Sequence, residues 1–148
     1  MKVITGIVGI LFLLLFFQTN KASLAPDKFN DNVVLSERVW LVEFYSDRCG
    51  SCKEFVPEWT RLEKQLVSIA TGKINIDEAE GMKLAQTFGV LDEGLPAILL
   101  FFSNEKKPIS LLEGDSALSH ARIISKIKDN LTDLKKAEDG FYVKAKLS

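Results

Sequence analysis

The sequence has little cysteine and almost no histidine, and both shortages limit the chemistry that its 148 residues can support. Two cysteines, Cys49 and Cys52, are too few for a disulfide-dense scaffold or for a four-cysteine zinc site. His120 is the single histidine, so a zinc site within one chain is not expected, and we predict neither a metal ion nor another cofactor. An excess of charge of one sign is also lacking, with 19 Lys and Arg against 20 Asp and Glu, so nucleic acid is not an expected partner.

A long hydrophobic run occurs at the start of the chain, at residues 3–17, where it follows Lys2 and precedes polar and small residues up to Ala25. This order is typical of a secretory signal peptide. The run is shorter than the roughly 20 apolar residues of a membrane-spanning helix, so we expect residues 1–25 to be removed, with cleavage after Ala22 or Ala25. An uncleaved anchor stays open as an alternative, and a membrane would be a partner only in that case. A buried core helix has the least support, because the run lacks a polar face.

The hydrophobic content of 47% is enough for one folded domain, which we place at residues 26–135, followed by a short C-terminal tail at 136–148. Within this domain, β-prone apolar runs alternate with stretches whose apolar residues recur every three or four positions. The patterns predict strands at 39–45, 73–77, 97–102 and 109–112, and helices at 29–35, 52–70 (interrupted by Pro57), 80–88 and 117–134. This order indicates an α/β fold with a parallel sheet covered on both faces and the last strand added as an antiparallel edge.

Cys49 and Cys52 are separated by Gly50 and Ser51 and lie where the first predicted strand gives way to a helix. Residues three apart in a first helical turn have Cβ atoms about 5–6 Å apart, so a small adjustment allows a disulfide. The helix start favours a thiolate, and CxxC motifs lower the pKa of the first thiol from ~8.5 into the range ~3.5–7.5. Cys49 is therefore the expected nucleophile and Cys52 the resolving thiol. A structural disulfide, half of a shared zinc site and two unrelated thiols are the alternatives, but CxxC beside a βαβ pattern favours redox chemistry.

Glu43 is a further candidate because it stands in the middle of an otherwise apolar strand. A carboxylate buried at such a position is costly unless it stays protonated or has a partner, and this suggests a functional role. The alternative is an acid that faces outward from the strand.

Several segments of the sequence resemble the thioredoxin superfamily, and a thioredoxin domain of protein disulfide isomerase in particular. The resemblance is densest in Val39–Lys53 and in Pro57-Glu58-Trp59, and it continues in Asn75-Ile76-Asp77, in residues 85–90 and in Leu95-Pro96. It implies a thioredoxin fold, which is a central mixed β-sheet flanked by helices with the redox CxxC at a helix N-terminus.

The resemblance also implies roles for individual residues. Pro96 would be a cis-proline facing the disulfide, and the backbone of Leu95 would pair with an incoming substrate strand. Glu43 would lie beneath the disulfide and take the proton from Cys52. The positions in and beside the motif that would contact the substrate are Arg48, Gly50 and Ser51.

Three features depart from the family pattern and leave specificity and redox poise open. Arg48 stands where the family usually has Trp, Ser51 stands where disulfide isomerases usually have His, and the segment from Val90 to Pro96 is longer than the family's loop.

The sequence thus predicts a thiol-disulfide oxidoreductase or protein disulfide isomerase that acts through Cys49 and Cys52 on disulfides of secretory-pathway proteins. Expected partners are protein or peptide substrates with thiols or disulfides, with glutathione or an upstream oxidase exchanging redox equivalents. The departures favour one alternative function, a substrate-binding or adaptor module with weak redox turnover.

The expected location is the lumen of the endoplasmic reticulum, with secretion or membrane anchoring as alternatives. Residues 145–148 do not match a Lys-Asp-Glu-Leu retrieval signal, so no motif explains retention there. Asn130-Leu131-Thr132 is a candidate N-glycosylation site that luminal entry would expose to modification.

Overall fold

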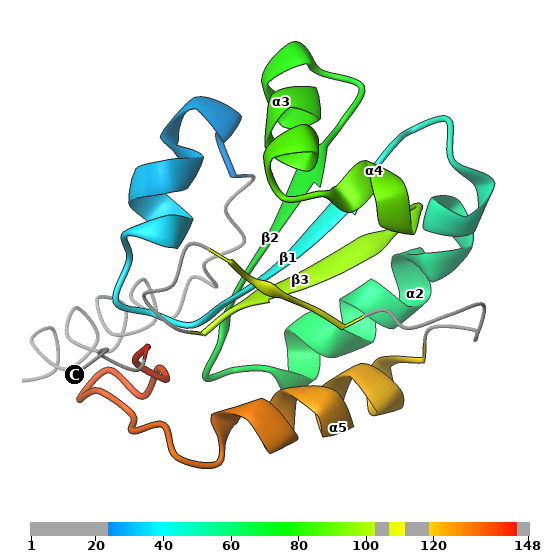
Figure 1. Cartoon of the computed structure of the whole chain (residues 1–148). Coiled ribbons are helices and arrows are strands. Elements are labelled where there is room, and N and C mark those ends of the chain that lie inside the picture. Colours follow the sequence, from blue (N-terminus) through cyan, green and yellow to red (C-terminus); the bar gives the residue numbers. More distant parts are fainter. Residues whose placement is uncertain (1–23, 103–106, 112–118, 145–148) are drawn as a thin grey trace, which may run out of the picture.

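The computed structural model describes residues 24–102, 107–111 and 119–144, which form a sheet with helices on both faces (Figure 1). The elements in chain order are η1 (Pro26–Lys28), η2 (Asn30–Val34), β1 (Trp40–Tyr45), α2 (Gly50–Gln65), β2 (Ala70–Asn75), α3 (Ala79–Thr87), α4 (Val90–Glu93), β3 (Ala97–Phe101), β4 (Ile109–Ser110) and α5 (His120–Leu131). The predicted signal peptide lies almost wholly outside the described residues, as do most of the turn after β3 and the first residues of the last predicted helix. No helix among the described residues has the length and apolar character needed to cross a bilayer.

β1 lies at the centre of a sheet with the strand order β2-β1-β3-β4. It pairs in parallel with β2 and antiparallel with β3, and β3 pairs antiparallel with β4. Its four inner residues are buried, as expected for a strand covered on both faces. The mixed sheet implied by the family resemblance is therefore confirmed.

Side chains alternate across β1, so each face of the sheet has its own core. Leu41 belongs to the cluster formed with α2 and α5, which includes Trp59 and Ile127. Val42 and Phe44 belong to the cluster on the opposite face, which the N-terminal helices and α3 cover (Figure 1). That second cluster contains aromatic rings with centroids 5.3–6.4 Å apart, contributed by Phe29, Phe44, Phe88 and Phe101.

The direction of β3 corrects the expectation that the first three strands would all be parallel. α3 is nine residues long, and Gly89, with a φ of 70°, turns the chain after it into α4. The longer segment expected at residues 90–96 thus contains a short helix. β3 begins beside the end of β1, where β2 also ends, because Phe44 pairs with Ala97 and Tyr45 with Asn75. β3 must therefore run antiparallel to β1.

The boundary between α2 and β2 also differs from the predicted one. α2 ends at Gln65 and not near residue 70, and β2 starts at Ala70, three residues before the predicted strand. Ile69 and Ala70 fit helical spacing as well as strand alternation, so periodicity alone did not separate them. Leu66 leaves the helical conformation with a φ of −91° and a ψ of 52°.

The helix expected at residues 29–35 is present in an irregular form. A 3-10 turn at Pro26–Lys28 is followed by a π-helical turn, in which Leu35 N donates to Asn30 O at 2.8 Å. Phe29, between the two turns, is buried in the aromatic cluster.

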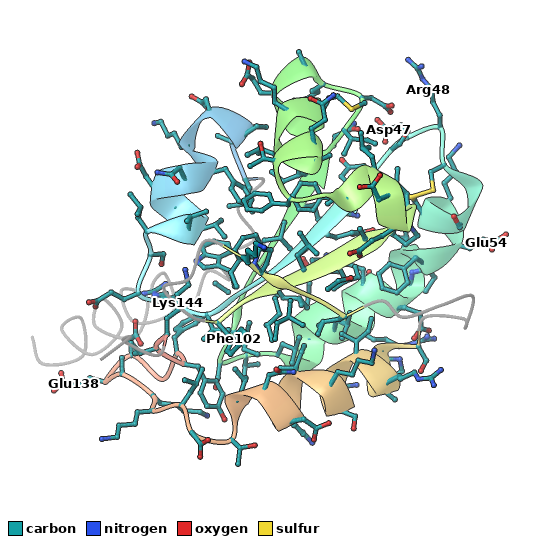
Figure 2. All side chains as sticks on the ribbon, viewed as in Figure 1. Asp47, Arg48, Glu54, Phe102, Glu138 and Lys144 are labelled. Atoms are coloured by element: carbon teal, nitrogen blue, oxygen red, sulfur yellow. A yellow bond between two sulfur atoms is a disulfide. The ribbon has the colours of Figure 1, made fainter. Side chains whose placement is uncertain are left out.

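The segment after Glu138, part of the expected C-terminal tail, packs against the domain up to residue 144. Val39 N donates to Tyr142 O at 3.0 Å, and Lys144 N donates to Glu37 O at 2.7 Å. The Lys144 side chain (labelled in Figure 2) is buried.

Candidate active site

Cys49 is the N-terminal cap of α2, and Cys52 lies in the first turn of that helix. Cys49 Sγ accepts a hydrogen bond from Cys52 N at 3.1 Å, which satisfies one of the N–H groups that a helix start leaves without a partner. The two sulfurs are joined in a disulfide, with the Cα atoms 5.2 Å apart (Figure 2). Cys49 is partly exposed, whereas Cys52 is 3% exposed. An external sulfur therefore reaches Cys49 more readily than Cys52.

Asp77 holds the loop that leads from β1 into the disulfide. Its carboxylate accepts from Ser46 Oγ and from Asp47 N, both at 2.9 Å. Ser46 in turn anchors the next residues, because its Oγ accepts from Arg48 N at 3.1 Å and its carbonyl accepts from Cys49 N at 3.1 Å. This chain of hydrogen bonds ties the position of Cys49 to the end of β2.

The peptide bond between Leu95 and Pro96 is cis, as the resemblance implied, and the Leu95 end of this bond lies beside Cys49. Leu95 O is 3.8 Å from Cys49 Sγ and accepts a hydrogen bond from Ser51 Oγ at 2.9 Å. Ser51 Oγ is also 3.2 Å from Cys49 Sγ. The structure thus brings together Cys49, Ser51 and the residue before the cis-proline.

Glu43 is fully buried, so it is not the outward-facing acid of the alternative interpretation. Alternation along β1 places its side chain on the face that α2 covers, the same face as Leu41. Lys73 stands opposite it in the ladder between β1 and β2, with Lys73 Nζ 2.9 Å from Glu43 Oε2. Burial raises the pKa of Glu43 above its ordinary value, and the hydrogen bond and charge of Lys73 act in the opposite direction.

Arg48 and Gly50 flank Cys49 at the surface. Both are exposed, and Figure 2 shows the Arg48 side chain directed away from the disulfide. The space where a Cβ of Gly50 would lie is open, with no other atom within 4 Å. Neither residue obstructs access to Cys49.

His120 forms a contact with Glu58 that the sequence did not indicate. Its backbone N–H donates to Glu58 Oε2 at 2.7 Å, and its Nδ1 is 2.6 Å from the same oxygen. The contact fixes the start of α5 to α2, and the hydrogen bonds lower the pKa of Glu58. His120 thus supports the packing of the two helices that cover the Glu43 face.

A disulfide at the first turn of the helix after a central strand, facing a cis-proline, defines the thioredoxin class of proteins. Comparison with known families agrees, since the thioredoxin family model matches residues 20–129. The chain belongs to the thioredoxin family.

Comparison with individual proteins is more specific than the family match. Protein disulfide-isomerase A6 of Mus musculus is 32% identical over 143 residues, covering 88% of this chain and 31% of the relative. The protein disulfide-isomerase A6 homolog of Drosophila melanogaster is 37% identical over 86 residues, 57% of this chain and 19% of that protein. The Trx4 domain of ERdj5 shares the fold with a TM-score of 0.63 at 24% identity, over 77% of this chain and 97% of the domain. The chain thus spans less than a third of the length of these curated relatives.

Two residues that support the site were not singled out from the sequence. Lys73 forms the ion pair with Glu43, and Asp77 holds the loop before Cys49. A signal for Lys73 was present, because a lone acid in an apolar strand needs a cation and Lys73 is the first residue of the next predicted strand. Asp77 was noted only as part of the family resemblance.

Proposed function

We propose that the chain is a thiol-disulfide oxidoreductase that acts on protein substrates, with Cys49 as the nucleophile and Cys52 as the resolving thiol. The observation that carries this proposal is the asymmetry of the pair, with a partly exposed Cys49 at the helix cap and a buried Cys52 one turn further on. N–H groups at a helix start stabilise a thiolate on Cys49. The similarity to proteins named protein disulfide-isomerase supports the same chemistry.

The proposed reaction is a thiol-disulfide exchange in two steps. The Cys49 thiolate attacks one sulfur of a substrate disulfide, forms a mixed disulfide and displaces the other substrate sulfur as a thiolate. Cys52 then loses its proton and attacks Cys49 Sγ, which releases the second substrate sulfur and leaves Cys49 and Cys52 joined. The substrate gains two electrons and the enzyme pair loses two. Glutathione or another thiol would return the enzyme to the dithiol form.

Glu43 is proposed to accept the proton of Cys52 in the second step. It is buried on the face that α2 covers, and Cys52 is a buried residue of α2. The raised pKa of Glu43 makes it a better proton acceptor than an ordinary carboxylate. We propose that the backbone of Leu95 binds an extended substrate segment beside the cis-proline, with Arg48, Gly50 and Ser51 contacting the same substrate.

We propose that these substrates are proteins of the secretory pathway, on the basis of the signal-peptide layout of residues 1–25. The test of location is expression of the full chain in a eukaryotic cell, followed by sequencing of the mature N-terminus. A start near residues 23–26 would support cleavage, and a start at Met1 would contradict it. A mobility shift that Asn130→Gln removes would add support for luminal entry.

The test of function is an insulin-reduction assay combined with a redox titration of the purified protein against glutathione. We expect insulin precipitation that depends on both Cys49 and Cys52, and a reversible two-electron transition. A protein that binds unfolded polypeptide but does not reduce insulin would favour the alternative of an adaptor module with weak turnover.

A further inference from the structure

The Ser51 hydroxyl lies between two acceptors that belong to different steps of the reaction. It is 2.9 Å from Leu95 O and 3.2 Å from Cys49 Sγ. A serine hydroxyl has one hydrogen to donate, so it serves one of these acceptors fully at a time. In the disulfide form the Cys49 sulfur is neutral, and Leu95 O is the stronger and nearer acceptor, so we infer that the hydroxyl donates to the carbonyl.

Reduction changes this balance. A thiolate on Cys49 carries a negative charge, and hydrogen bonds to charged acceptors are roughly twice as strong as those between neutral groups. The 3.2 Å separation already suits an O–H to sulfur hydrogen bond, so a rotation of the hydroxyl hydrogen is enough. The hydroxyl then serves Cys49, and Leu95 O loses its hydrogen-bond donor.

Leu95 O is well placed for a substrate that is bonded to Cys49. It lies 3.8 Å from Cys49 Sγ, and Leu95 precedes the first residue of β3 that pairs with β1, Ala97. A polypeptide whose cysteine joins Cys49 brings its own backbone N–H groups to within reach of this carbonyl. The carbonyl is therefore contested by Ser51 and by the substrate backbone.

We propose that Ser51 is a positioning residue whose hydroxyl controls, according to the redox state of Cys49, whether Leu95 O is free to accept a hydrogen bond from a substrate. We call this control the gate. Its hydroxyl occupies the carbonyl in the disulfide form and releases it when Cys49 is a thiolate. The gate rests on the proposed oxidoreductase function and deepens it. In the dithiol protein, Leu95 O is free to bind the backbone of a substrate that carries a disulfide. In the disulfide protein, Ser51 occupies Leu95 O, so a substrate dithiol cannot use it. The gate therefore favours reduction of polypeptide substrates over their oxidation.

The test compares two reductants of the oxidised protein. One is a synthetic peptide with two cysteines, and the other is dithiothreitol, which has no backbone N–H. In both reactions a reductant thiolate attacks Cys49 Sγ and displaces Cys52 as a thiolate, and the second reductant thiolate then displaces Cys49, so that the reductant becomes a disulfide and the enzyme a dithiol. Rates are followed by acid quenching, alkylation of free thiols and separation of the oxidised and reduced protein.

We expect Ser51→Ala to raise the rate with the peptide, relative to the rate with dithiothreitol, by about 3- to 10-fold, the range of one hydrogen bond. Ser51→Thr keeps the hydroxyl and should match the wild type. A second readout is thiolate absorbance at 240 nm in the reduced protein, which should fall at neutral pH in Ser51→Ala and stay unchanged in Ser51→Thr.

An equal peptide-to-dithiothreitol rate ratio in wild type and Ser51→Ala would overturn the gate, and so would a threonine variant that behaves like the alanine variant. Unchanged thiolate absorbance in Ser51→Ala would show that the hydroxyl does not donate to the Cys49 thiolate in the reduced protein. If dithiothreitol reduces every variant, the dithiol peptide reduces none, and the reduced wild type also fails to reduce the disulfide form of the same peptide, the proposed oxidoreductase function itself fails, and the gate falls with it.

Discussion

Glu43 and Lys73 face each other across the ladder between β1 and β2, and Lys73 Nζ lies 2.9 Å from Glu43 Oε2. The pair is asymmetric, because the Glu43 side chain is fully buried whereas that of Lys73 is 32% exposed. Lys73 Nζ also lies 4.5 Å from the centre of the Tyr45 ring. The buried carboxyl therefore has a cationic partner that keeps contact with solvent, and two opposing influences set its pKa.

The first prediction concerns proton transfer from Cys52. Glu43→Gln should slow release of the second substrate sulfur by about 100-fold or more while the first attack by Cys49 changes much less, because general-base assistance is lost only in the second step. The defect should shrink at high pH, where the thiol ionises without help. Lys73→Met should raise the pKa of Glu43 further, since it removes the charge that lowers it, and should move the acidic limb of the release rate to higher pH.

Single-turnover kinetics with a fluorescent disulfide peptide, measured across pH, separate the two steps. A pH profile that Lys73→Met leaves unchanged would show that Glu43 does not act in release. An equal slowing of both steps by Glu43→Gln would point to a general loss of structure instead.

The second prediction assigns the two cysteines. Cys52→Ser should accumulate mixed disulfides with substrate proteins, because the thiol that resolves them is missing, whereas Cys49→Ser should not, because its remaining sulfur is buried. Non-reducing electrophoresis after acid quenching would measure the trapped species. Comparable trapping by the two variants would reverse or remove the assignment.

The third prediction concerns redox poise. A histidine between the cysteines stabilises the reduced thiolate and makes a disulfide more oxidising, so Ser51→His should raise the reduction potential. Arg48→Trp should change it less, because the Arg48 side chain is exposed and directed away from the disulfide, where solvent and salt screen its charge (Figure 2). We also expect the wild-type potential to lie below that of a histidine-containing isomerase domain. Equilibration with glutathione gives all three values, and a larger shift from Arg48→Trp would refute the ranking.

The sequence predicted much of the fold because the strongest patterns are local. The apolar run at 39–45 required a strand covered on both faces, and the CxxC at its end marked the start of a helix. The direction of β3 could not be predicted from local patterns, because it depends on where the segment between β2 and β3 returns to the sheet. The segment that holds α3, the turn at Gly89 and α4 returns the chain beside the end of β1, and this path does not alter the alternation of strands and helices.

The residues of the candidate site also differ in how far local sequence patterns could predict them. Cys49, Cys52 and the buried Glu43 were identifiable because each stands out against its own neighbours in the sequence. The partners Lys73 and Asp77 come from another strand and the loop after it, and strand register and tertiary contact bring them to the site, whereas Leu95 was expected there from the family resemblance. No local pattern encodes the contacts of Lys73 and Asp77, so the sequence indicated the proposed reacting groups more readily than the residues that support them.

The fourth prediction tests the close approach of α3 to the end of β2. A Cβ added at Gly81 would lie 2.0 Å from Asn75 O, a backbone atom that cannot rotate away. Gly81→Ala should therefore destabilise the protein by about 1–3 kcal/mol, although alanine is the better helix former. Gly50→Ala is the matched control, because its Cβ meets open space and the change should be neutral or stabilising by up to about 1 kcal/mol. Urea unfolding measures both, and equal stabilities of the two variants would contradict the contact.

The last prediction concerns Lys144, whose Nζ donates to Val33 O at 2.6 Å and to Val34 O at 3.0 Å at the end of η2. Its side chain is buried, and this burial lowers its pKa from 10.5 to about 8. Between these two pH values the unfolded chain holds a proton that the folded protein has released. The free energy of unfolding contributed by Lys144 should therefore rise with pH across this interval and be constant below it.

Lys144→Met lacks this titration, so the stability of the wild type relative to Lys144→Met should increase by ~3 kcal/mol from pH 8 to pH 10.5, at about 1.4 kcal/mol for each unit of pKa shift. Lys135→Met, at an exposed lysine of the same segment, is the matched control for loss of one lysine charge. Chemical denaturation at a series of pH values measures both differences. A flat difference for Lys144→Met would mean that the ammonium group reaches solvent and that the C-terminal segment does not enclose it in solution.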